Sequence, residues 1–145
     1  MEASKNDVIK GVRVTGEYYV KEYVLRVLKQ DNPENAEIET VDTLVSSEET
    51  DTGFVLTFTR AIGFVPSGIF ETIVTILADV EFENDAGKKI LKSSEERKDW
   101  IENNKIRIAN TFGMPATASA MIASAMVHAG FGPMVTPPTV IIKQQ

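Results

Sequence analysis

The most constraining feature of the sequence is the stretch Asn110–Pro138, NTFGMPATASAMIASAMVHAGFGPMVTPP. Its middle contains no acidic, Lys or Arg side chain and is rich in alanine, serine and methionine. Proline is tolerated in the first turn of a helix, and glycine commonly ends a helix in the left-handed conformation. We therefore predict a helix from about Pro115 to Ala129 that Gly130 terminates. Because a surface helix normally shows a charged stripe, we expect this one to be covered on most sides, by the sheet or by the sheet and a second copy.

Four segments upstream of this helix have the alternation or composition of strands. The cleanest is Phe54–Ile62, in which phenylalanine and leucine fall on one side and mainly threonine, valine and alanine on the other. Arg60 interrupts the apolar side, and we take it to mark where that face leaves the core. The other three segments are Val12–Lys29, Ala36–Ser46 and Ile69–Glu83.

The segment Val12–Lys29 keeps a period of two that changes phase near Lys21–Glu22. One extra residue in a strand swaps its two faces, so a bulge at this point would keep the segment a single strand. A helix from Glu22 to Gln30 is the alternative, and the sequence leaves both open.

Two helical segments follow the strands. Ser93-Ser94-Glu95-Glu96 has the form of a capping box, which predicts a helix from about Ser94 to Asn110. The motif Phe112–Pro115 then breaks or kinks the helical stretch. Strands followed by helices predict an α+β fold with an antiparallel sheet.

Composition bounds the class of protein. A chain of 145 residues fits one domain, which we place at residues 11–145 behind a flexible polar leader at residues 1–10. The formal net charge of −6 argues against nucleic acid or an anionic membrane as the main partner. No apolar run resembles a signal peptide or reaches the roughly 18 residues of a membrane span. We therefore predict a cytoplasmic protein without membrane insertion.

The sequence offers little catalytic equipment. It contains no cysteine and a single histidine, so one chain cannot build the usual three-ligand zinc site. His128 lies near the end of the apolar helix, where a structural role is expected. The carboxylate pairs Glu37/Glu39 and Glu81/Glu83 are explained most simply by a solvated sheet face. We predict no catalytic residues, no metal site, no cofactor and no enzymatic activity.

The helix and its exit resemble the SecB family of preprotein export chaperones. The residues that carry the resemblance are Met114-Pro115, the helix Ala116–His128, Gly130-Phe131-Gly132-Pro133 and Thr136-Pro137-Pro138. They correspond to the family's Phe-Pro helix start, its Gly-Phe-Pro-like turn and its Leu-x-Pro-Pro-like exit. The resemblance implies a four-stranded antiparallel sheet packed against a long kinked C-terminal helix, in a homotetramer built as a dimer of dimers.

The same resemblance implies ATP-independent binding of unfolded polypeptides or preproteins in apolar grooves between helix and sheet. Aromatic and methionine side chains give adaptable apolar contacts, so the candidate peptide-binding residues are Phe54, Phe58, Phe131 and Met134. Small and apolar side chains of the main helix allow close approach of another copy. The candidate oligomer-interface residues are Ala118, Met121, Ile122, Ala125 and Met126.

Two alternatives stay open beside the holdase. The chain could be a non-enzymatic oligomeric adaptor or scaffold of the same fold with one dedicated protein partner. It could also be a small enzyme or ligand-binding domain that uses its carboxylates, although the sequence gives this little support. The export motor is a further candidate partner, but the acidic and aromatic first-strand pattern that contacts it in the family has only a loose echo in Glu17, Tyr18, Tyr19 and Glu22.

Overall fold

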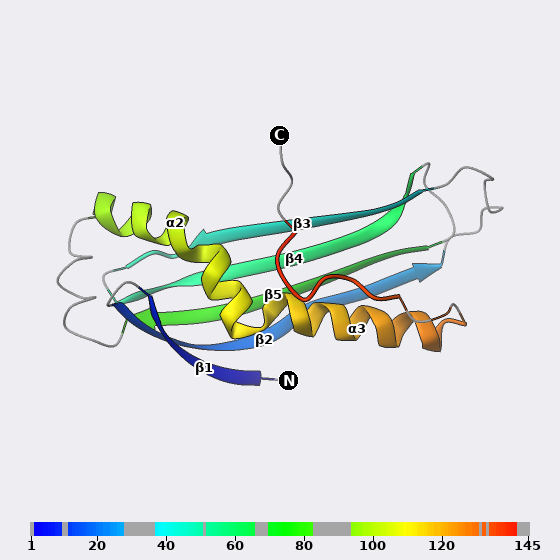
Figure 1. Ribbon diagram of the computed structural model, residues 1–145, viewed down its shortest axis with the longest axis horizontal. Helices are drawn as coiled ribbons and strands as arrows, with labels where there is room; N and C mark the ends of the chain where they lie inside the picture. The colour runs from blue at the N-terminus through cyan, green and yellow to red at the C-terminus, as the bar shows by residue number, and fades with distance from the viewer. Residues whose placement is uncertain are drawn as a thin grey trace.

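The strands form one antiparallel sheet in the computed structural model, which describes residues 2–9, 12–27, 37–50, 52–65, 70–82, 94–130, 132 and 134–141. Within those residues the sheet has five strands in the order β1-β2-β5-β4-β3 (Figure 1). The strands are β1 (Glu2–Ile9), β2 (Val12–Val27), β3 (Glu37–Ser47), β4 (Gly53–Val65) and β5 (Phe70–Phe82). The four strands expected from the sequence are β2, β3, β4 and β5, and the antiparallel α+β architecture is confirmed.

Strand β1 is the element that the sequence analysis did not anticipate. Residues 2–9 fall in the expected polar leader, but they pair with β2 in a register that runs from Glu2 opposite Tyr19 to Ile9 opposite Val12. A strand ladder is held by backbone hydrogen bonds, which a polar segment can make as well as an apolar one. The leader is therefore corrected to an edge strand over residues 2–9.

Strand β2 is continuous and contains the expected bulge. Its pairing with β5 shifts register between Val20 and Glu22, and the strand continues to Val27. This confirms the bulged strand, whereas the alternative helix beginning at Glu22 is wrong for the described part of that segment. The shift explains why the core-facing side chains of β2 are even-numbered up to Val20, whereas Leu25 packs against the core after the bulge.

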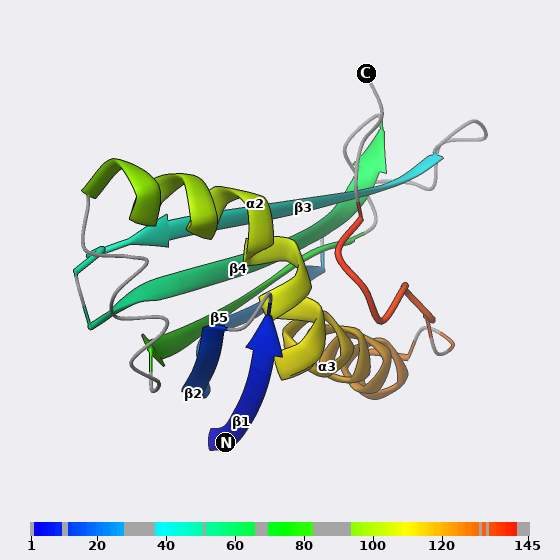
Figure 2. The same cartoon turned by 60° about the vertical axis from the view of Figure 1, so that its left-hand side comes forward.

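Two helices cover a single face of the sheet, α2 (Ser94–Phe112) and α3 (Met114–His128) (Figure 2). Gly113 separates them with a left-handed φ of 77°, a conformation that favours glycine. The expected single kinked helix is therefore corrected to two helices. Helix α2 begins at Ser94, as the capping box predicts, but Ser93 itself lies outside the described residues.

Helix α3 ends as the sequence predicts. Its last residue is His128, and Gly130 follows with a left-handed φ of 89°. The amides of Ala129 and Gly130 donate to the carbonyl oxygens of Ala125 and Val127, at 2.9 and 3.1 Å. These bonds satisfy carbonyl groups that the last turn leaves without helical partners. None of the described helices is both long and apolar enough to cross a membrane.

The core lies between the helices and the face of the sheet that they cover. Alternate residues of β5, from Phe70 to Phe82, are buried on this face, as the period of two requires. Trp100 of α2 packs edge-on against Phe82, with ring centroids 5.6 Å apart. The hydroxyl groups of Tyr18 and Tyr23 on β2 contact α3, at Thr117 Oγ1 (3.2 Å) and the Met121 carbonyl (2.8 Å).

Candidate functional site

The phenylalanines expected to bind peptide from β4 are in the core. Phe54 is 3% exposed and Phe58 is 0% exposed, because the even-numbered residues at this end of β4 all face the helices. An aromatic side chain under a helix cannot contact a polypeptide unless that helix moves away. The assignment of Phe54 and Phe58 to a peptide groove stays a prediction, and in the single chain both side chains pack in the core between the sheet and the helices.

The two expected groove residues after α3 have different outcomes. Phe131 lies outside the described residues. Met134 is half-buried and packs against the core, whereas its neighbour Val135 is 89% exposed. The apolar surface of this segment that faces solvent is thus the valine rather than the methionine.

The expected oligomer-interface residues mostly face the chain's own sheet. Ala118, Ile122, Ala125 and Met126 are buried, and Met121 is half-buried. The exposed side of α3 is instead formed by Ala116, Ala120, Ser124, Val127 and His128. Helix α3 is therefore covered on one side only within the single chain, and the uncovered side carries no Asp, Glu, Lys or Arg side chain.

A buried ion pair joins β4 to β3. Arg60 Nε donates to Asp42 Oδ1 and Arg60 Nη2 to Asp42 Oδ2, both at 2.8 Å, and neither side chain is exposed to solvent. The two residues are direct cross-strand partners. Parallel donation of this kind is the strong geometry for an arginine–carboxylate pair. The sequence expectation that Arg60 marks the end of the core face is wrong, because Arg60 lies inside the core.

The remaining donors of Arg60 hold the segment that follows α3, which we call the strap (residues 134–141). Arg60 Nη1 donates to Thr136 Oγ1 at 3.0 Å and to the Pro137 carbonyl at 2.6 Å, and Nη2 donates to the Thr139 carbonyl at 3.0 Å. All five N–H donors of the guanidinium are thus used. The strap turns back along α3 and crosses β4 toward β3 (Figures 1 and 2).

Further bonds fix the strap at both of its ends. Ser119 Oγ donates to the Thr136 carbonyl at 2.7 Å, and the Val140 amide donates to Asn110 Oδ1 at 2.8 Å. The Ile141 amide donates to Asp42 Oδ2, also at 2.8 Å. The strap is therefore bonded to both helices and to β4 and β3, and it lies between the helices and β3 on this side of the sheet.

The opposite face of the sheet is not covered by either helix (Figure 2). Its centre is a band of uncharged side chains that are half-buried or exposed, and Val45 reaches 50% exposure. We call this surface the outer band, and it consists of Val41, Thr43, Val45, Thr57, Thr59, Ala61, Ile73, Thr75 and Leu77. Threonine and β-branched residues suit a half-exposed pleated surface. The band can therefore lie in contact with water although none of its side chains is charged.

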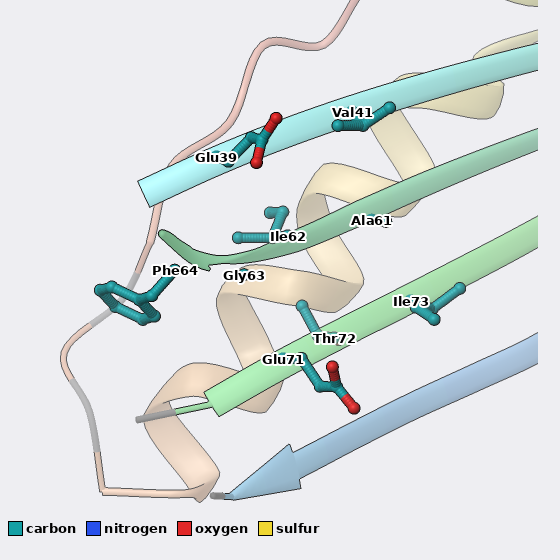
Figure 3. A pocket seen from close by; sticks show the side chains of 9 residues that line it. All are labelled: Glu39, Val41, Ala61, Ile62, Gly63, Phe64, Glu71, Thr72 and Ile73. Carbon is teal, nitrogen blue, oxygen red and sulfur yellow. The ribbon is translucent and has the colours of Figure 1, made fainter. Parts of the chain in front are cut away.

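One end of the outer band is hollowed into an open depression of about 200 Å³ (Figure 3). Its floor is formed by the small residues Ala61 and Gly63 of β4. The neighbouring strands carry taller side chains, Val41 and Glu39 on β3 and Ile73 and Glu71 on β5; Ile62, Phe64 and Thr72 complete the lining. The sequence analysis did not predict this depression. The signal for it would have been the two small residues of β4, flanked on the neighbouring strands by the carboxylates of Glu39 and Glu71.

The titratable groups singled out in the sequence lie at separate, exposed places on the described part of the chain. His128 is exposed at the end of α3, and Glu37, Glu39 and Glu81 are exposed on the sheet. Partial burial against α3 raises the pKa of Tyr23 above its ordinary 10.0. Among the described residues, no three His, Asp or Glu side chains are grouped so that they could hold a metal ion.

Comparison with known proteins places the fold. No protein-family model matches the sequence, and no curated protein matches it. The structure is similar to that of a SecB-like chaperone from Mycobacterium tuberculosis, solved in complex with a ChAD peptide from the HigA1 antitoxin. The TM-score is 0.56 at 9% sequence identity, and the match covers 98% of this chain and 92% of that chain. At this identity the likeness concerns the fold, and it supports the SecB-like architecture that the helix-exit motif implied.

Proposed function

We propose that this protein is a cytoplasmic, ATP-independent holdase that binds unfolded or extended polypeptides. The observation that carries the proposal is the outer band, an uncharged and half-exposed sheet surface in a protein whose fold is that of a peptide-binding chaperone. Exposed apolar surface of this kind marks interaction sites in soluble proteins. A polypeptide in extended form can lay alternate side chains along it, as strands do.

This proposal moves the binding surface from the helix side of the sheet to its outer side. Phe54 and Phe58, two of the residues expected to bind clients, are buried, and the strap occupies the space between the helices and β3. The outer band needs no rearrangement to become accessible. Its lack of charge avoids the cost of desolvating ionised groups when an apolar segment docks.

Assembly is a second part of the proposal. The exposed side of α3 carries no Asp, Glu, Lys or Arg side chain, and Val127 on it is 55% exposed. Small side chains let another backbone approach closely, so this side of α3 fits a second copy of the chain. We propose a homo-oligomer, a dimer or tetramer, joined through Ala116, Ala120, Ser124 and Val127 rather than through the residues that face the sheet.

Aggregation suppression tests the holdase directly. A chemically unfolded protein is diluted with and without this one, and light scattering gives both the aggregation and the mass of the oligomer. We expect suppression at about one oligomer per client without nucleotide. Val45→Glu places a charge in the outer band and should weaken suppression, whereas Val135→Glu on the strap serves as the matched control. Full suppression by Val45→Glu would remove the outer band from the site.

The alternative is an adaptor of the same fold with one dedicated partner. The structural neighbour was solved with a peptide from one antitoxin. By analogy, this protein could bind one partner rather than many. Client breadth separates the two functions. A well-folded oligomer that suppresses the aggregation of none of several unrelated proteins would reject the holdase and leave the adaptor.

A further inference from the structure

One edge of β2 is covered along only half of its length. Strand β1 pairs with β2 from Val12 to Tyr19, where Glu2 is its last partner. Strand β2 continues to Val27 and pairs with β5 on its other side. Among the described strands, none lies beside residues 20–27 on the side away from β5. Figure 1 shows β1 along one half of β2 and α3 along the other half.

The hydrogen-bonding groups on this uncovered half follow from a contact with β5. Thr72 Oγ1 of β5 donates to the Val24 carbonyl at 2.8 Å, so this carbonyl points toward β5. Along a strand, the backbone groups of successive residues point to opposite neighbours. The amides and carbonyls of Tyr23, Leu25 and Val27 therefore point away from β5, to the uncovered side. Such a row of backbone groups is a template for pairing with another strand.

The bulge limits the length of this template. The register of β2 against β5 shifts between Val20 and Glu22, which separates the half that β1 covers from the other half. The regular part that remains runs from Glu22 to Val27, and we call it the open edge. At about 3.4 Å per residue, the open edge matches an extended segment of about six residues.

The two faces of the open edge differ in polarity. On the helix face, Tyr23 is 36% exposed and Val27 is 61% exposed, and the Tyr23 hydroxyl donates to the Met121 carbonyl of α3. On the outer face, the exposed side chains of Glu22 and Arg26 carry opposite charges. A strand added at this edge would place alternate side chains on the two faces. Apolar residues suit the helix face, and uncharged polar residues suit the outer face.

Strand β1 shows that this side of β2 accepts an extended segment. Residues 2–9, EASKNDVI, pair with it in antiparallel direction although the segment is mostly polar. Backbone hydrogen bonds supply such pairing, and the side chains that alternate along the added strand supply its specificity. A polypeptide segment with apolar residues at every second position would have the same backbone bonds and better contacts with Tyr23 and Val27.

We infer that the open edge binds an extended polypeptide segment as an additional antiparallel strand, through the backbone groups of Tyr23, Leu25 and Val27. The inference rests on the proposed polypeptide-binding function and adds to it a site that is distinct from the outer band. Recognition through the backbone requires alternation of apolar and polar residues rather than one particular sequence, which suits a protein that binds several clients.

The test uses three fluorescein-labelled peptides of six residues in which valine and threonine alternate. One is unmodified, one is N-methylated on its valines, and one is N-methylated on its threonines. With the valines opposite Tyr23 and Leu25, the valine amides face β2 and the threonine amides face solvent. Anisotropy titrations with the full chain should show the N-methylvaline peptide binding about tenfold weaker than the other two, because it lacks the amides that pair with β2.

Variants of the protein locate the site. Val27→Pro removes an amide that faces the open side, and proline is tolerated on an edge strand. We expect it to bind the unmodified peptide about fivefold more weakly than Val27→Ala, which keeps the amide. Val45→Glu in the outer band should leave the affinity for this peptide unchanged. Thermal unfolding of each variant confirms that it is folded, and the N-methylated peptides test the same bonds on the wild-type protein.

The outcomes separate this inference from the proposed function. Equal affinity for the two N-methylated peptides overturns the edge site, as does failure of all three peptides to bind. Loss of peptide binding in Val45→Glu assigns the peptide to the outer band and also overturns the edge site. A lower oligomer mass for Val27→Pro than for Val27→Ala, without peptide binding to the wild type, assigns the edge to a second copy of the chain and overturns the inference. In each case the holdase stands if the wild type suppresses aggregation, and it falls only if suppression is absent.

Discussion

The two faces of the sheet are built from the same strands by the same alternation, yet they differ in what they bury. On the helix face, β4 places Leu56, Phe58 and Arg60, all 0% exposed. On the outer face, the same strand places Thr57, Thr59 and Ala61, which are half-buried. Large side chains lie where helices cover them, and small or hydroxyl-bearing ones lie where water reaches. The side chains of the helix face therefore stabilise the fold, whereas those of the outer face remain accessible to a binding partner.

The largest effect on stability should come from removing the buried ion pair on the helix face. Arg60→Met leaves the Asp42 carboxylate buried without its partner and releases the strap, so we expect a loss of about 3–5 kcal/mol in the free energy of unfolding. Urea unfolding followed by circular dichroism measures it. The double variant Arg60→Met with Asp42→Leu removes both charges and should recover part of the loss. A loss below about 1 kcal/mol for Arg60→Met would contradict the buried arrangement.

A matched pair of glycine substitutions sharpens the contrast between the faces. On the helix face, a Cβ at Gly16 would overlap the Phe112 ring and lie 2.8 Å from the Asp79 carbonyl oxygen. We expect Gly16→Ala to cost about 1–3 kcal/mol, as overpacking does. On the outer face, Gly63→Ala meets nothing within 4 Å and should be neutral or stabilise by less than about 1 kcal/mol. Equal melting temperatures for the two variants would contradict the difference.

The smallest effect is the loss, at alkaline pH, of the stability that Tyr23 contributes on the helix face. The pKa of Tyr23 is raised by desolvation, and its hydroxyl donates to the Met121 carbonyl. A raised pKa means that the unfolded chain ionises first, so the contribution of Tyr23 is complete below about pH 10 and is lost as pH rises through the folded pKa. The stability difference between wild type and Tyr23→Phe should therefore shrink as the pH rises above about 10. A difference that stays constant over this range would contradict the assignment.

Much of the fold was predictable because short sequence patterns determine its strands and helix ends. The period of two in Phe54–Ile62, the phase change near Lys21–Glu22 and the glycine at position 130 each depend on a few neighbouring residues. Strand β1 was missed because its pairing with β2 is made by backbone groups, which have no signature in side-chain chemistry. The break at Gly113 was located, but the sequence could not say whether it kinks one helix or separates two.

The candidate site was harder to predict, because it depends on which face is covered. Phe54 and Phe58 were recognised as one apolar row, but the row alone does not reveal that helices lie on it. The burial of Arg60 depends on Thr136, which is 76 residues away in the sequence. The depression depends on the absence of side-chain volume at Ala61 and Gly63, between strands whose register the sequence does not specify.

The strap also has a consequence for the order in which the protein can be completed during synthesis. Thr136 follows Arg60 by 76 residues, which at about 5–20 residues per second corresponds to roughly 4–15 seconds of translation. During that interval β3 and β4 can pair, but the guanidinium lacks three of the acceptors that it has in the finished molecule. The nascent sheet is therefore expected to stay loosely closed on that side until the Pro137-Pro138 segment has emerged from the ribosome.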